Sequence, residues 1–185
     1  MTACNEPSNH LLRNLSPIGI GSRSSYVRAE RSLHLTNQPK STVEALNRVL
    51  ADSFALYLKC KNFHWHVSGP HFRDYHLMLD EQATQVLAIT DLVAERVRKR
   101  GGTTLRSIGH VSRLQTLDDN DQEAVDAKAM LSELRGDNQS LIENLRVARA
   151  LAEDEEDSAT SSIIDEWIDQ AEERVWFLSQ AAAGG

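Results

Sequence analysis

Two histidines and three carboxylates in the stretch 62–96 are the residues of this chain best suited to bind a metal. They are His64, His76, Asp80, Asp91 and Glu95. Imidazole nitrogens and carboxylate oxygens are ligands that iron and similar divalent metals accept. Gly69 and Pro70 interrupt the stretch, so we expect His64 to end one helix and His76 to lie on the next.

The spacing of the last four of these residues places them on one face of the second helix. His76 and Asp80 are four residues apart, as are Asp91 and Glu95. The two pairs share a stripe of the helix, but they are separated by roughly 16 Å along its axis, which one ion cannot bridge. Both pairs can therefore serve one metal only if a second copy of the helix runs antiparallel across a two-fold axis.

Taken singly, each of these residues is more often a solvated surface group or a satisfied core histidine than a ligand. Five of them on one stripe, flanked by Trp65 and Phe72, favour a metal site.

The same residues resemble the signature of the Dps proteins, the DNA-binding proteins from starved cells. The pattern is His64-Trp65 followed by His76, Asp80, Asp91 and Glu95, and the similarity covers roughly residues 42–178. The resemblance implies an all-α fold, a ferritin-like four-helix bundle with a short extra helix in the long middle connection. It also implies a homo-oligomer, a hollow shell of twelve subunits built from two-fold dimers.

The function implied by the resemblance is the oxidation of ferrous iron and storage of the ferric product, which protects DNA from oxidative damage. The resemblance implies hydrogen peroxide as the preferred oxidant, ahead of oxygen. The centre lies between two-fold-related chains: one chain contributes the residues matching His64, His76 and Asp80, and its mate contributes those matching Asp91 and Glu95.

Two sequence features refine this resemblance. Ordinary ferritins hold iron inside one bundle with Glu-x-x-His repeats, and this chain contains no such repeat. Many Dps relatives have an Asp-x-Thr-x-Asp motif lining the pore through which iron enters, and here the matching stretch 158–162 reads SATSS. The acidic run 153–157, or Asp165, is the alternative source of negative charge there.

Apolar periodicity and breaker residues predict the elements that position the site. We expect a helix from Ser41 or Thr42 to His66, a second from His71 to Lys99, a short one over 107–113 and a third long one over 123–152. We expect the acidic run 153–157 to be a solvated turn before the last helix. The bundle should span residues 39–181, and residues 182–185 should fray.

Several apolar sets are expected to form the core of the bundle. The first helix has an apolar stripe of Val43, Leu46, Leu50, Phe54, Tyr57 and Leu58. The second helix should bury Leu77, Thr84, Leu87, Ala88 and Leu92. The third should bury a seam interrupted by Asn138, and the fourth Ile164, Trp167, Ile168, Ala171, Val175 and Leu178.

Charge is distributed unevenly along the chain. The net charge is −7, yet residues 1–40 carry five basic and two acidic side chains (5 − 2 = +3), which leaves −10 for the remainder. We interpret residues 1–38 as a flexible basic tail. Two roles for this tail are open: it binds DNA, or it has no function in nucleic-acid binding.

The cellular setting follows from composition. The two cysteines give no disulfide framework, and no apolar run is long enough to span a membrane, so we expect a cytoplasmic protein, nucleoid-associated if it binds DNA. The alternatives to the Dps interpretation are a 24-subunit ferritin, a nucleoid-binding structural protein with a secondary metal site, and a helical bundle without metal.

Overall fold

The computed structural model describes residues 38–183 of the chain. Within them lie five helices and no strand: α2 (Thr42–His66), α3 (Phe72–Lys99), α4 (Ile108–Leu114), α5 (Ala127–Asp154) and α6 (Ser158–Ala183). The expected all-α class is confirmed. No helix in this range is both long and apolar enough to cross a membrane. The tail expected over 1–38 falls outside the described residues except for Gln38.

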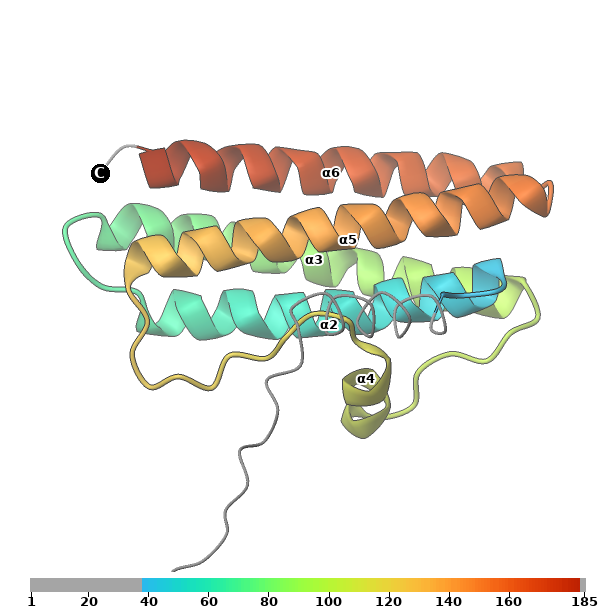
Figure 1. Cartoon of the computed structure of the whole chain (residues 1–185), viewed down its shortest axis with the longest axis horizontal. Coiled ribbons are helices and arrows are strands. Elements are labelled where there is room, and N and C mark those ends of the chain that lie inside the picture. Colours follow the sequence, from blue (N-terminus) through green and yellow to red (C-terminus); the bar gives the residue numbers. More distant parts are fainter. Residues whose placement is uncertain (1–37, 184–185) are drawn as a thin grey trace, which may run out of the picture. The chain divides into compact units, whose positions relative to one another are not determined.

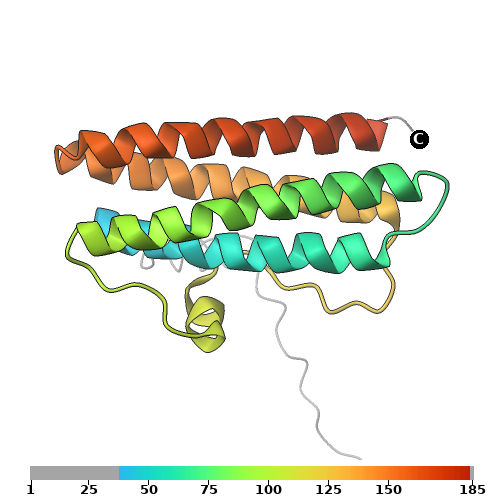
Figure 2. The ribbon, with the colours of Figure 1, turned by 180° about the vertical axis from the view of Figure 1, so that it is seen from behind.

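The four long helices lie side by side along one axis (Figures 1 and 2). α2 and α3 run in opposite directions, as do α5 and α6, whereas α3 and α5 run in the same direction. The connection between α3 and α5 returns along the bundle and carries α4, which packs against α2. One long crossover of this kind is the topology of ferritin-like bundles.

Side-chain caps decide where three of the helices begin. Ser41 accepts a hydrogen bond from the Glu44 amide at the start of α2, as expected, and Ser107 caps α4 in the same way. Asp126 accepts hydrogen bonds from two amides of the first turn of α5, so this helix begins at Ala127. The expected start at residue 123 was therefore wrong by four residues.

Aliphatic side chains fill the space between the helices, as their sequence periods predict. The fully buried ones include Leu46, Leu50, Leu131, Leu134, Leu141, Leu145, Ile164 and Leu178. Asn138, the polar interruption of the seam on α5, is also buried and accepts a 2.7 Å hydrogen bond from Arg174 Nε on α6. Cys60 is fully buried in the core, and burial raises the pKa of its thiol to about 12.

The prediction for the core face of α3 was wrong. Leu77, Thr84, Leu87, Ala88 and Leu92 are all exposed, and the helix instead buries Leu79, Ala83, Val86, Ile89, Val93 and Val97. On α2, Leu58 of the expected apolar stripe is likewise 59% exposed. Apolar side chains thus occupy two faces of this helix pair, and only one face meets the rest of the bundle.

Asp52, buried in α2, attaches the long crossover to the bundle. Its Oδ1 accepts hydrogen bonds from the backbone amides of Thr116 (2.5 Å) and Leu117 (3.3 Å). Its Oδ2 accepts from the Thr116 hydroxyl (2.9 Å) and from Asn144 Nδ2 on α5 (2.8 Å). Burial raises the pKa of Asp52 although these hydrogen bonds lower it. One carboxylate thus links three segments that are distant in sequence.

Candidate metal centre

The turn between α2 and α3 places His64 and His76 next to each other. α2 ends at His66, where the Val67 amide donates to the Phe63 carbonyl, and α3 begins at Phe72. Between them Gly69 adopts a φ of +107°, a conformation that side-chain-bearing residues rarely adopt. The chain therefore reverses within a few residues.

The rings of His64 and His76 form a stacked pair held by two reciprocal hydrogen bonds. Their centroids are 3.8 Å apart and the planes differ by 20°. Nδ1 of each ring lies 2.8 Å from the backbone carbonyl oxygen of the other residue. Because a carbonyl oxygen only accepts, each Nδ1 carries a proton, and Nε2 is the ring nitrogen left to bind a metal. A backbone acceptor that orients an imidazole in this way is usual for metal-binding histidines.

Asp80 lies one turn beyond His76 on α3, on the same side of the helix. Its Oδ1 accepts a 2.6 Å bond from Lys61 Nζ of α2, and this contact lowers the pKa of the Asp80 carboxyl group. About half of the Asp80 side chain is exposed. His64, His76 and Asp80 are therefore brought to one region by two neighbouring helices.

Asp91 and Glu95 lie farther along α3, and both are exposed. Glu95 Oε2 accepts a 2.9 Å bond from Lys99 one turn away. Roughly 16 Å of helix separates this pair from the His76–Asp80 pair. Within residues 38–183, no three histidine, cysteine or acidic side chains lie close enough to hold one ion. A single chain thus presents two incomplete ligand sets.

Several large apolar side chains are exposed on the two helices that carry the candidate ligands. We define the α2–α3 face by its exposed large apolar side chains, Leu58, Trp65, Phe72, Leu77, Leu87 and Leu92. Ile108 of α4 is also a large apolar side chain that is exposed, to 80%. Exposed large apolar side chains that gather on one face are characteristic of protein–protein interfaces.

The sequence interpretation missed Lys61. Its spacing contained the signal, because a residue three positions before His64 lies on the same side of a helix. Lys61 therefore lies close enough to His64 to reach Asp80 on the neighbouring helix.

Comparison with known proteins places the chain in a family. The ferritin-like domain family matches residues 43–183. A DNA protection during starvation protein of Brevibacillus brevis is 33% identical over 136 residues, which cover 72% of this chain and 89% of the relative. The chain belongs to the Dps family.

Further relatives of this Dps chain agree with that assignment. An uncharacterized low temperature-induced protein of Nostoc is 33% identical over 148 residues, covering 80% of this chain and 83% of that protein. The crystal structure of a Dps protein from Bacillus brevis superposes with a TM-score of 0.72 at 31% identity, covering 75% of this chain and 93% of that one. The resemblance and the ferritin-like bundle expected from the sequence are thus confirmed.

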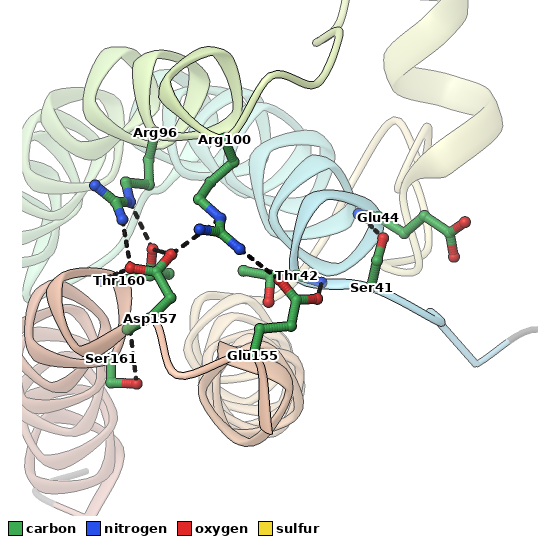
Figure 3. Close-up of polar contacts among 9 residues, drawn as sticks. All are labelled: Ser41, Thr42, Glu44, Arg96, Arg100, Glu155, Asp157, Thr160 and Ser161. Carbon is green, nitrogen blue, oxygen red and sulfur yellow. Dashed lines mark hydrogen bonds and ion pairs between the residues drawn. The ribbon is translucent and has the colours of Figure 1, made fainter. Parts of the chain in front are cut away.

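A second polar cluster of this Dps chain lies where the end of α3 meets the turn between α5 and α6 (Figure 3). Arg96 Nη2 contacts Asp157 Oδ1 at 2.5 Å, and Arg100 Nε contacts Asp157 Oδ2 at 3.2 Å. Thr160 donates its amide and hydroxyl to the same carboxylate. Burial raises the pKa of Asp157, but the hydrogen bonds from Arg96 and Thr160 outweigh it and lower this pKa to about 2.

This cluster corrects the expectation for the acidic run 153–157. Glu153, Asp154 and Glu156 are exposed, but Asp157 is buried and caps α6. Glu155 accepts from the Thr42 amide and pairs with Arg100 at 2.9 Å. The charges of Asp157 and Glu155 are therefore compensated by arginines of α3. Asp165 is likewise paired, at 2.5 Å, with Arg149.

Proposed function

We propose that this Dps-family chain oxidises ferrous iron with hydrogen peroxide and stores the ferric product in a dodecameric shell. The observation that carries the proposal is the stacked pair of His64 and His76, whose reciprocal hydrogen bonds leave Nε2 of both rings to bind a metal. Iron is the substrate of this reaction, and the donor set of imidazoles and carboxylates suits the ferrous ion.

The proposed centre is shared between two chains related by a two-fold axis. One chain supplies His64, His76 and Asp80, and the partner supplies residues equivalent to Asp91 and Glu95. Two antiparallel copies of α3 would bring the separated pairs together and would form two centres by symmetry. The exposed apolar side chains of the α2–α3 face support this arrangement, since a dimer would bury them.

The interior of the bundle supports a shared centre over the intrachain site of a 24-subunit ferritin. Lys59, 6% exposed, makes ion pairs with Glu133 (2.9 Å) and Asp137 (2.8 Å). Arg174 is 2% exposed and bonded to Asn138. Glu133 and Asp137 are thus already paired with Lys59, and the side-chain oxygen of Asn138 is already bonded to Arg174, so these groups are engaged with cations of the chain itself.

The chemistry of the proposed centre is a two-electron reduction of peroxide. Two ferrous ions each give one electron, the O–O bond breaks, and two protons complete two water molecules. Because both electrons are delivered at one centre, no hydroxyl radical is released, and this would protect DNA nearby. Neutral histidines bind the ferrous substrate, while the carboxylates favour the ferric product.

The test combines rapid kinetics with mass measurement. Ferrous iron is mixed with peroxide without oxygen, and the ferric absorbance is followed for wild type, His64→Ala and Glu95→Ala. We expect at least a tenfold loss of rate in both variants. Glu81→Ala, an exposed acid on the same helix, is the matched control and should retain the wild-type rate.

Light scattering on the same samples separates the alternatives. About twelve subunits are expected for wild type and all three variants, whereas about 24 would indicate an ordinary ferritin shell. Wild-type oxidation rates in both ligand variants would overturn the assignment of the centre. DNA binding without iron oxidation would favour the nucleoid-binding alternative.

A further inference from the structure

Lys59 of α2 carries a buried positive charge that contacts two carboxylates of α5. Its side chain is 6% exposed, and Nζ lies 2.9 Å from Glu133 Oε1 and 2.8 Å from Asp137 Oδ2. Glu133 and Asp137 are four residues apart, so they project from the same face of α5. Neither contact has hydrogen-bond geometry, so the ammonium group holds the two carboxylates through its charge.

The crossover holds one of these carboxylates from another side. Asn120 Nδ2 donates a 2.8 Å hydrogen bond to Glu133 Oε2, and Asn62 on α2 donates to the Asn120 carbonyl oxygen at 3.2 Å. The side chains of Glu133 and Asp137 are 31% and 13% exposed, so the pair is partly accessible to solvent. The carboxylates are therefore positioned and within reach of dissolved ions, whereas the Lys59 side chain is buried.

Two converging carboxylates of this kind suit a divalent cation. Carboxylate oxygens are the side-chain ligands that Mg²⁺ and Mn²⁺ prefer in proteins. Burial lowers the pKa of Lys59, but its contacts with Asp137 and Glu133 outweigh burial and raise this pKa. Lys59 is therefore positively charged at physiological pH, and a metal ion must displace this charge to bind the pair.

We propose that Glu133 and Asp137 form a divalent-cation site within one chain, and that the Lys59 ammonium group occupies it in place of a metal ion. Loss of Lys59 would leave two acids in a mostly buried position without a counter-charge, and they would require another cation. The argument uses contacts inside one chain and is independent of the shared centre. For the proposed function, the consequence is that ferrous iron in wild type binds at the shared centre without competition from this pair.

The test counts the Mn(II) ions that the assembled protein binds. Bound and free Mn(II) are separated by equilibrium dialysis and measured by electron paramagnetic resonance, for wild type and Lys59→Ala. We expect Lys59→Ala to bind about one more Mn(II) per chain than wild type, because alanine removes the ammonium group and leaves room for an ion with its water ligands. Mn(II) should also raise the thermal unfolding midpoint of Lys59→Ala more than that of wild type.

Three further variants separate the site from general effects of charge. Lys40→Ala removes an equal charge from an exposed position and should bind as much Mn(II) as wild type. Lys59→Ala combined with Asp137→Asn lacks one of the two carboxylates and should lose the additional ion. Asp137→Asn alone, with Lys59 in place, should leave the wild-type number of ions unchanged.

The outcomes that contradict this inference are distinct from those that contradict the proposed function. Assembled Lys59→Ala that binds no additional Mn(II) would show that the two carboxylates do not form a site. Failure of this variant to fold both with and without Mn(II) would show the same, whereas folding only with Mn(II) would support the site. A lower Mn(II) count in Asp137→Asn would show that the pair binds metal despite Lys59. The shared centre is tested separately, by the oxidation rates of His64→Ala and Glu95→Ala.

Discussion

His64 and His76 each donate a hydrogen bond from Nδ1 to the other's backbone carbonyl, at 2.8 Å in both directions. The two residues are 12 positions apart, at the end of one helix and the start of the next. This reciprocity fixes both ring orientations with backbone atoms of the same turn. The ligand positions of the proposed centre thus depend on the geometry of the α2–α3 turn.

Replacement of His76 by alanine tests this dependence. The change removes a proposed ligand and also the ring that stacks on His64, so we expect peroxide-driven iron oxidation to fall at least tenfold. His66→Ala is the matched control, because His66 Nδ1 also bonds a backbone carbonyl, that of Asn62, but its ring is outside the stacked pair. Equal rates in the two variants would contradict the proposed role of the pair.

Charges on the α2–α3 face should prevent the proposed dimer and abolish activity while all five ligand residues remain. Leu87 and Leu92 are 41% and 53% exposed in the chain, and we expect Leu87→Arg with Leu92→Arg to give a species near the 20.7 kDa monomer by light scattering. Burying two arginines against apolar side chains opposes association. The oxidation rate should fall with the loss of the dimer.

The control for this variant is the double change Gln139→Arg with Ser140→Arg. It adds the same charge to exposed positions of α5, away from the α2–α3 face. A fully active monomer would exclude a centre shared between chains.

The Asp157 cluster should make stability depend on acid pH. The pKa of Asp157 in the folded state, about 2, lies below the ordinary value of 3.8. The contribution of this carboxylate to folding stability is therefore present above about pH 4 and is lost as the pH falls toward 2. This difference corresponds to about 2 kcal/mol of unfolding free energy. Asp157→Asn should be less stable than wild type by about that amount at pH 7 in urea unfolding.

The unfolding free energies of wild type and Asp157→Asn should become more similar as the pH falls and Asp157 is protonated. At pH 2 to 3 the wild-type advantage should shrink, because the wild-type carboxyl is then increasingly protonated in both states. A difference in stability that is independent of pH would show that the charge of Asp157 does not stabilise the fold.

Asp52→Ala should release the crossover from the bundle. The change leaves the partly buried amide of Thr116 and the buried amide of Leu117 without their acceptor, which should lower the unfolding free energy by about 2–4 kcal/mol. Hydrogen exchange of these two amides should accelerate more than that of amides in α5 and α6. Uniform acceleration throughout the bundle would indicate a general loss of stability instead of a local one.

Two interpretations of the basic N-terminal segment were left open by the sequence, an arm that binds DNA and a tail with no such role, and a deletion separates them. Residues 1–40 carry a net charge of +3, and several copies on one shell would act together on one duplex. If the segment binds DNA, removal of residues 1–38 should abolish the gel shift of the full-length protein at low salt and leave iron oxidation unchanged. A shift that survives the deletion would exclude the segment as the DNA-binding element.

The helices, and the shared helix face of His76 and Asp80, were predictable because their signals are local. Ser41 caps α2 where its sequence predicts, and the four-residue spacing of His76 and Asp80 fixes a shared face in any helix. The wrong assignment of Leu77, Leu87 and Leu92 to the core has a physical cause. Periodicity shows that a face is apolar, but it does not show whether the bundle or another chain covers it.

Contacts between segments that are distant in the sequence could not be predicted from local sequence patterns. Arg96 and Asp157 are 61 residues apart, and no spacing rule relates them. The acidic run was therefore expected to be solvated. In the structure, Asp157 forms ion pairs with two arginines and accepts a hydrogen bond from an amide in the first turn of α6. Lys61 and Asp80 are 19 residues apart on different helices, so their contact follows only from the packing of α2 on α3.

The buried thiol of Cys60 bears on how such a protein would tolerate its own oxidant. With a pKa of about 12, the thiolate that reacts with peroxide is present in roughly one molecule in 100,000 at pH 7. Met130, also in the core, is 2% exposed and is shielded by the same packing. In the proposed reaction, the sulfur atoms of these two residues would therefore not compete with iron for peroxide.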